Sequence, residues 1–149
     1  MSAELASAIL TVSRTVKWGE CDPAGIVYTP RFSDFVVEAH IACFEHLFGG
    51  PPYELLRPQG LALPAKALSI EFKHSLLPNQ PFDMQVKISA IRTRTYDVAV
   101  TGFTRQGIEA FSGTLTLICI NLATHKSQAL PDILLHKLRD AMRPGSGSL

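Results

Sequence analysis

Polar and apolar residues alternate along five segments of the chain, and this period of two predicts five β-strands. The first segment covers residues 9–18, with one face formed by Leu10, Val12, Arg14 and Val16. The other four lie in the second half of the chain, over residues 68–73, 82–90, 96–101 and 108–121. Because the last three are joined by only a few residues each, we expect them to form an antiparallel meander.

A helix pattern lies between the first and second predicted strands. Thr29 suits the N-cap, Pro30 suits the first helical position, and the run Gly49-Gly50-Pro51-Pro52 ends the pattern. Apolar residues occupy two neighbouring rows and leave the polar residues a thin stripe, so we expect a helix buried over most of its circumference. The rows are Phe32, Phe35, Val36, Ala39, Cys43 and Leu47, and Val37, Ile41, Phe44 and Phe48.

One sheet that curls around one long helix satisfies both patterns, and this is an α+β arrangement. We therefore predict a single domain over residues 1–149 with the hotdog fold, a five-stranded antiparallel sheet wrapped around one central helix. A short helix is expected over residues 131–142, and a frayed tail over residues 144–149.

Composition excludes several functional classes. The chain has 149 residues, 46% hydrophobic and 18% charged, with a net charge of +1, which indicates a folded globular protein. Its basic residues are scattered, so no nucleic-acid partner is expected. Three cysteines far apart predict reduced thiols. Without a signal-peptide pattern or a long apolar run, we expect no membrane association, a cytoplasmic location and association between copies.

The candidate chemistry lies in the turn-rich segment before the predicted helix. Asp22 stands seven positions before the expected N-cap, close to the positive end of a buried helix. Since Pro30 has no N–H, the backbone donors expected there belong to Thr29, Arg31 and Phe32. A carboxylate beside such donors can attack an activated acyl group, or activate water, while the amides hold the oxyanion. From spacing alone, however, such an Asp more often caps a turn or a helix.

The segment Cys21-Asp22-Pro23-Ala24-Gly25-Ile26-Val27-Tyr28, followed by the aromatic Phe32, resembles the signature of the 4-hydroxybenzoyl-CoA thioesterase family. The order of strand, signature, long helix and four strands is similar over most of the chain. The resemblance implies an acyl-CoA thioesterase in which Asp22 is the nucleophile or general base. It also implies that the Thr29 backbone amide is the oxyanion donor and that Gly25 permits close backbone approach.

The same resemblance implies an aryl- or short acyl-CoA substrate and a homodimer or homotetramer in which a neighbouring subunit completes the pocket. No organic cofactor and no metal are implied, because coenzyme A is part of the substrate. Thr29 and Arg31 depart from the residues frequent in the family, which leaves the acyl group open. Tyr28 and Arg31 are the candidate contacts at the acyl end.

The predicted hairpin that carries Arg92, Arg94 and Thr95 is the candidate contact for the phosphates of coenzyme A. In the resembling enzymes this region touches the nucleotide, although hairpin arginines often only add solubility. No glycine loop of the Walker or dinucleotide-binding kind occurs, which favours a nucleotide held mainly at the surface.

Other constellations are weaker. His40 and Cys43 are three positions apart on the helix, but two ligands are too few for a metal site. Glu38 and Glu45 could supply a helix carboxylate, as in another hotdog lineage, yet the His-Gly-Gly turn of that lineage is absent. His74 has no partner motif, and no Gly-x-Ser-x-Gly elbow occurs. A module that binds acyl-CoA or acyl carrier protein without cleaving it is the alternative function.

Overall fold

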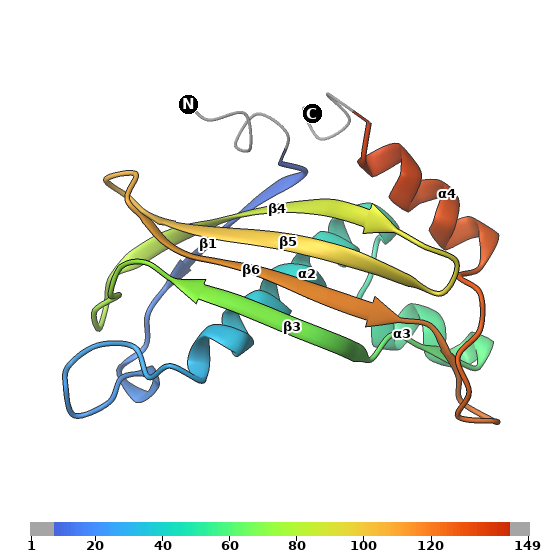
Figure 1. Ribbon diagram of the computed structural model, residues 1–149, viewed down its shortest axis with the longest axis horizontal. Helices are drawn as coiled ribbons and strands as arrows, with labels where there is room; N and C mark the ends of the chain where they lie inside the picture. Colours follow the sequence, from blue (N-terminus) through green and yellow to red (C-terminus); the bar gives the residue numbers. More distant parts are fainter. Residues whose placement is uncertain (1–7, 144–149) are drawn as a thin grey trace.

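The computed structural model describes residues 8–143, in which a long helix lies across one face of a five-stranded antiparallel sheet (Figure 1). This arrangement confirms the predicted α+β hotdog fold. The helix is α2 (Arg31–Phe48). The strands follow the spatial order β1 (Leu10–Thr15), β4 (Pro81–Ile91), β5 (Thr95–Thr104), β6 (Glu109–Ile118) and β3 (Ala65–Phe72).

The core forms between α2 and the inner face of the sheet. Every second side chain of β4 and β5 is buried there, as the period-two pattern predicts. The helix contributes Phe35, Val36 and Ala39, none of which retains exposed surface. The expected meander is confirmed, because β4 pairs with β5 and β5 pairs with β6, all antiparallel.

Several boundaries differ from the prediction. Helix α2 begins at Arg31 with Pro30 as the N-cap, so the expectation of Thr29 in that role was wrong by one residue. Pro30 already has helical angles and no side chain caps the helix start. The helix ends at Gly49 as expected, where a φ of 83° suits glycine and the Gly49 N–H donates to the carbonyl of Glu45.

The segment after Gly49 holds elements that the pattern did not predict. These are α3 (Pro52–Leu56), the 3-10 turn η2 (Arg57–Gln59) and the strand β2 (Leu61–Ala62), which pairs with β7 (Ile120–Asn121). The predicted first strand likewise splits into β1 and the turn η1 (Trp18–Glu20). The terminal helix is confirmed as α4 (Asp132–Ala141), while the expected tail lies outside the described residues.

Helix α2 is less enclosed than its sequence predicts. The first apolar row is covered by the sheet, but Val37 and Ile41 of the second row keep 37% and 36% of their surface exposed. The neighbouring edge strand β3 is open as well, with Leu68 at 40% and Phe72 at 52%. Because β3 is the last strand of the sheet, nothing in the described chain lies beyond it to cover this side.

Candidate active site

A closed turn between η1 and α2 holds Asp22. The Asp22 amide donates to the carbonyl of Ile26 at 3.0 Å, and the Gly25 amide donates to the carbonyl of Asp22 at 2.9 Å. One carboxylate oxygen of Asp22, Oδ1, accepts a hydrogen bond from the Ala24 amide at 2.9 Å. The other, Oδ2, has no hydrogen bond to a described residue. The turn thus fixes the side chain of this half-buried residue while leaving one carboxylate oxygen available for chemistry.

The start of α2 leaves a single backbone donor available. The Arg31 amide donates to the carbonyl of Tyr28 at 2.8 Å, and the Phe32 amide donates to that of Thr29 at 3.2 Å. The expectation that these two amides are unoccupied was therefore wrong, because the first turn closes on itself. The Thr29 amide donates to none of the described residues, and it lies at the positive end of the helix.

The Asp22 turn is anchored to the sheet and to the helix start. The Val27 amide donates to the carbonyl of Leu76 at 2.9 Å, and the Tyr28 amide donates to the carbonyl of Glu20 at 2.8 Å. In the first turn of the helix, the ring of Phe32 lies edge-on to that of Phe72, with 5.1 Å between the centroids. Asp22 is therefore placed at the end of the sheet where β3 finishes.

An ion-pair cluster behind the Asp22 turn was not foreseen from the sequence. The guanidinium of Arg14 donates to both oxygens of Glu20, with Nη1 at 2.7 Å, and to Glu38 from Nε at 2.9 Å. Its carbon lies 4.3 Å from the centre of the Phe35 ring. We call Arg14, Glu20 and Glu38 the Arg14 clamp. It joins β1, the residue just before Cys21-Asp22, and α2.

Charge pairing shifts the pKa values of the clamp. The hydrogen bonds that Arg14 donates to Glu20 hold the pKa of Glu20 below its usual range and raise the pKa of Arg14. The Glu20 carboxylate also accepts a hydrogen bond from the Lys17 amide at 2.8 Å. A sequence signal was available, because Arg14 takes a core-facing place in the alternation of β1. A cation at such a place requires anionic partners.

Of the sequence-predicted site residues, Gly25, Tyr28, Thr29 and Arg31 lie with Asp22 at one end of the molecule. Gly25 has a φ of 80°, a conformation that glycine adopts without strain. The Tyr28 side chain is 52% exposed, and Arg31 is exposed and pairs with Asp34 at 3.2 Å.

Arg92, Arg94 and Thr95 lie at the opposite end of the sheet. The register aligns Thr95 and its neighbour with the Ala65 end of β3, whereas Asp22 adjoins the Phe72 end (Figure 1). Eight residues of β3 separate these ends by about 24 Å. Within one chain, therefore, the structure does not bring the hairpin residues to Asp22.

The hairpin residues are also engaged with neighbours. Arg92 donates from Nη1 and Nη2 to the two oxygens of Asp97, both at 2.9 Å, and the pKa of Asp97 is lowered mainly by these bonds. Arg94 donates to Ser127 Oγ at 2.8 Å, and Thr95 is buried. Both guanidinium groups remain exposed, so contact with a phosphate is sterically open.

The competing constellations have structural explanations. Glu38 belongs to the Arg14 clamp and Glu45 is exposed, while His40 and Cys43 are buried in the core. His74 lies exposed with its Nδ1 at 2.9 Å from the carbonyl of Ser75. Among residues 8–143, no group of three or more potential ligands could hold a metal ion. No helix in this part of the chain has the length and apolar character needed to cross a bilayer.

Comparisons with known proteins agree with this architecture. The family model of the thioesterase-like superfamily matches residues 16–138, so the chain belongs to that superfamily. A thioesterase superfamily protein from Jannaschia sp. CCS1 is similar with a TM-score of 0.83 and 28% identity, over 93% of this chain and 96% of that chain.

Two further solved structures share the fold. A 1,4-dihydroxy-2-naphthoyl-CoA thioesterase from Synechocystis has a TM-score of 0.81 and 19% identity, over 90% of this chain and 98% of that chain. The gentisyl-coenzyme A thioesterase BH1999 has a TM-score of 0.76 and 21% identity, over 85% and 99% of the two chains. A search of curated proteins gave no match.

Proposed function

We propose that this protein hydrolyses an acyl-CoA thioester to a free acid and coenzyme A, with Asp22 as the catalytic carboxylate. The observation that carries the proposal is that, within residues 8–143, one carboxylate oxygen of Asp22 has no hydrogen bond and the Thr29 amide before α2 donates none. Membership of the thioesterase-like superfamily supports the reaction class. Neighbours named as CoA thioesterases support coenzyme A as the leaving group.

Two routes give the same products. In the first, Asp22 Oδ2 attacks the thioester carbonyl, the C–S bond breaks, and water then cleaves the resulting anhydride. In the second, Asp22 takes a proton from water and the hydroxide attacks the carbonyl. In both, negative charge develops on the carbonyl oxygen, where the Thr29 amide and the helix dipole stabilise it. The thiolate of coenzyme A leaves, and no metal or organic cofactor takes part.

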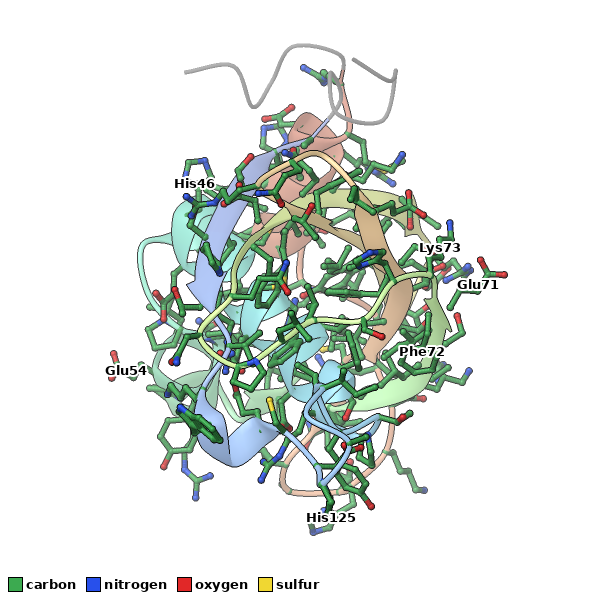
Figure 2. The ribbon with its side chains drawn as sticks, turned by 90° about the vertical axis from the view of Figure 1, so that its left-hand side faces the viewer. His46, Glu54, Glu71, Phe72, Lys73 and His125 are labelled. Atoms are coloured by element: carbon green, nitrogen blue, oxygen red, sulfur yellow. The ribbon has the colours of Figure 1, made fainter. Side chains whose placement is uncertain are left out.

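A second copy of the chain is part of the proposal. Leu68 and Phe72 on the open edge strand, with Val37 and Ile41 on α2, form an exposed apolar face that a homodimer would cover. Figure 2 shows Phe72 set inward of Glu71 and Lys73, which lie at the outer rim. If two β3 strands pair antiparallel about a two-fold axis, the Phe72 end of one copy lies beside the Ala65 end of the other.

That pairing would bring the predicted hairpin residues of one copy close to Asp22 of the other. The Arg92–Thr95 hairpin of one copy then lies on the same side as Asp22 of the other, about 24 Å from its own Asp22. Arg92 and Arg94 could there contact the phosphates of coenzyme A, and a tetramer would follow from two such dimers. The aryl or short acyl group implied by the sequence resemblance stays a prediction.

Hydrolysis of a panel of CoA thioesters by wild type and Asp22→Asn tests the catalytic assignment. We expect kcat to fall by about 10²- to 10⁴-fold in the variant, because the loss of a positioned acid or base costs that much. Asp34→Asn is the matched control, since Asp34 is an exposed carboxylate in the first turn of α2 that pairs only with Arg31 among the described residues. Full activity of Asp22→Asn would overturn the assignment, and binding without cleavage by wild type would favour a non-catalytic acyl-CoA module.

Association through β3 has its own test. Leu68→Lys places a charge on the exposed apolar face, so the molar mass measured by light scattering should fall from that of a dimer or tetramer to that of a monomer. Ile133→Lys is the control, because Ile133 is 68% exposed on α4, away from the β3 edge. An unchanged mass for Leu68→Lys would contradict this interface.

A further inference from the structure

An apolar pocket of about 410 Å³ opens beside the middle of α2. Its lining residues come from that helix, α3, β2 and the sheet, including Ala65 at the start of β3. Figure 1 shows α3 near this end of β3. Its volume falls in the range of small-molecule pockets, which are mostly apolar with a few polar groups. The aliphatic side chains that line it include Val37, Ile41, Leu61, Leu63, Leu115 and Leu117. We call it the α2–α3 pocket.

The lining of the α2–α3 pocket carries no carboxylate and little charge. Its basic residues are His40 and Arg57. Arg57 is exposed and stacks on the Tyr53 ring, with 5.3 Å from its guanidinium carbon to the ring centre. His40 is 5% exposed, has no hydrogen bond to another described residue, and is neutral at pH 7 because burial lowers its pKa to about 4. Such a pocket favours an uncharged hydrocarbon and disfavours an acyl group with a second carboxylate.

The pocket is continuous with the apolar face that reaches the candidate catalytic residues. Phe32, in the first turn of α2, contacts Phe72. Phe72 and Leu68 are exposed on β3, and Val37 is exposed on α2 and also lines the pocket. Val37 lies six residues beyond Arg31, about 9 Å along the helix axis. A strip of apolar surface thus connects the helix start with the pocket.

We infer that the α2–α3 pocket binds the hydrocarbon chain of the acyl group, so that the substrates are medium-chain aliphatic acyl thioesters. The inference rests on the proposed function and names an acyl group that differs from the aryl or short acyl group implied by the sequence resemblance. The volume holds roughly a dozen groups of the size of a water molecule, at about 30 Å³ each, which corresponds to an acyl chain of about eight to twelve carbons. In the proposed dimer the Ala65 end of one copy, where its α2–α3 pocket opens, lies beside Asp22 of the other copy, so a chain that leaves Asp22 along the apolar face can enter that pocket.

A chain-length series from acetyl-CoA to dodecanoyl-CoA tests the inference, with benzoyl-CoA beside it. For wild type we expect kcat/KM to rise by about fourfold for each methylene that enters the pocket, the factor that corresponds to burial of one CH₂ group. Hexanedioyl-CoA, which ends in a carboxylate, should be cleaved more slowly than hexanoyl-CoA by about tenfold or more. A series that is flat, or highest for acetyl-CoA or benzoyl-CoA, would overturn the inference.

Variants of the pocket sharpen the test. Ala62→Phe fills the pocket, so activity on dodecanoyl-CoA should fall by about tenfold or more while activity on butanoyl-CoA changes by less than about twofold. Leu63→Ala enlarges the pocket and should shift the optimum to a longer chain. Ile108→Phe, at an exposed apolar site in the β5–β6 turn, is the control and should leave the series unchanged. An equal loss on all chain lengths for Ala62→Phe would contradict the pocket assignment.

Binding to Asp22→Asn protein separates the two proposals. Calorimetric titration with butanoyl-CoA and dodecanoyl-CoA should show tighter binding of the longer chain. The double variant Asp22→Asn/Ala62→Phe should lose this preference for the longer chain. If chain-length-dependent binding is present but wild type cleaves no thioester, the pocket stands and hydrolysis fails. If wild type cleaves all thioesters alike and binding ignores chain length, hydrolysis stands and the pocket assignment fails.

Discussion

The two halves of helix α2 differ in how their surroundings hold them. At its first half, the Arg14 clamp and the hydrogen bonds of the Asp22 turn fix polar groups at distances of 2.7 to 3.2 Å. In its second half, His40 has no hydrogen bond to a described residue, and Ile41 lines an apolar pocket together with Val37 from the end of the first half. The first half therefore adjoins polar groups held by hydrogen bonds, and the second half adjoins an apolar pocket.

This difference fits a site in which one part of the helix positions the catalytic groups and the other binds the hydrocarbon chain. Catalytic groups must be held in fixed directions, because misplacement by about 1 Å can cost a large part of the rate. A pocket for a hydrocarbon chain needs no such directions, since burial of apolar area depends little on orientation. The polar half should therefore tolerate substitution poorly, while the apolar half should tolerate volume-conserving exchange.

Replacement of Arg14 by Met should have the largest effect on stability. It leaves the Glu20 carboxylate without its cation at a site where that side chain is only 11% exposed. We expect a loss of about 3 kcal/mol in the free energy of unfolding, measured by urea denaturation. Thioesterase activity should also fall, because Glu20 adjoins the Asp22 turn.

Glu38→Gln is the matched control for the clamp. Glu38 is the outer partner of Arg14 and its side chain is 47% exposed, so the expected loss is below about 1 kcal/mol. Equal losses for Arg14→Met and Glu38→Gln would show that the clamp is not centred on Glu20.

The second half of the helix should impose a pH dependence on stability. Burial lowers the pKa of His40 from 6.5 to about 4, so between these values the unfolded chain binds a proton that the folded chain does not. The free energy of unfolding should therefore fall as the pH decreases from 6.5 to 4, by roughly 2–3 kcal/mol.

His40→Leu should flatten this dependence, because it removes the buried imidazole and retains an apolar side chain of similar size. The measurement is urea denaturation at several pH values. His46→Leu is the control, since His46 is exposed on the same helix. Glu20, whose pKa is lowered, adds stability that is lost only at more acidic pH, so the two contributions can be separated. An unchanged pH dependence in His40→Leu would contradict the prediction.

A smaller effect is expected from the Asp22 turn itself. Gly25→Ala should cost about 1–2 kcal/mol, because a Cβ atom is strained at a φ of 80°. No atom lies within 4 Å of the added methyl group, so the cost comes from the backbone alone. Gly19→Ala, also without neighbours within 4 Å but without a positive φ, should be nearly neutral in thermal denaturation. Equal shifts for both variants would argue against backbone strain at Gly25.

The fold could be predicted from the sequence because each element carries its period. The strand alternation and the helix between Pro30 and Gly49 placed the main elements within a few residues. The exposure of Val37 and Ile41 could not be predicted, since an apolar row has the same pattern whether this sheet or a second copy covers it. Short elements such as β2 carry too few residues for a period to show.

The candidate site was predicted in part. Asp22, Gly25 and Thr29 lie within eight residues of one another in the sequence, so a motif could identify them together. Whether they act as proposed stays a prediction. The occupied amides of Arg31 and Phe32 depend on the closure of the first helical turn, which spacing does not determine. The Arg14 clamp joins β1 to residues 6 and 24 positions away, and only the packing of β1 against α2 brings its charges together.

The open edge of β3 also affects the tendency of the unpaired chain to aggregate. An edge strand with exposed apolar side chains can template the growth of cross-β aggregates. Here Lys66 and Glu71 interrupt the apolar residues of the strand, and both are exposed. Charges at such positions oppose the stacking of many copies in register, while a single antiparallel pair can accommodate them. These charges thus disfavour the growth of cross-β aggregates from β3 while the newly made chain is still monomeric.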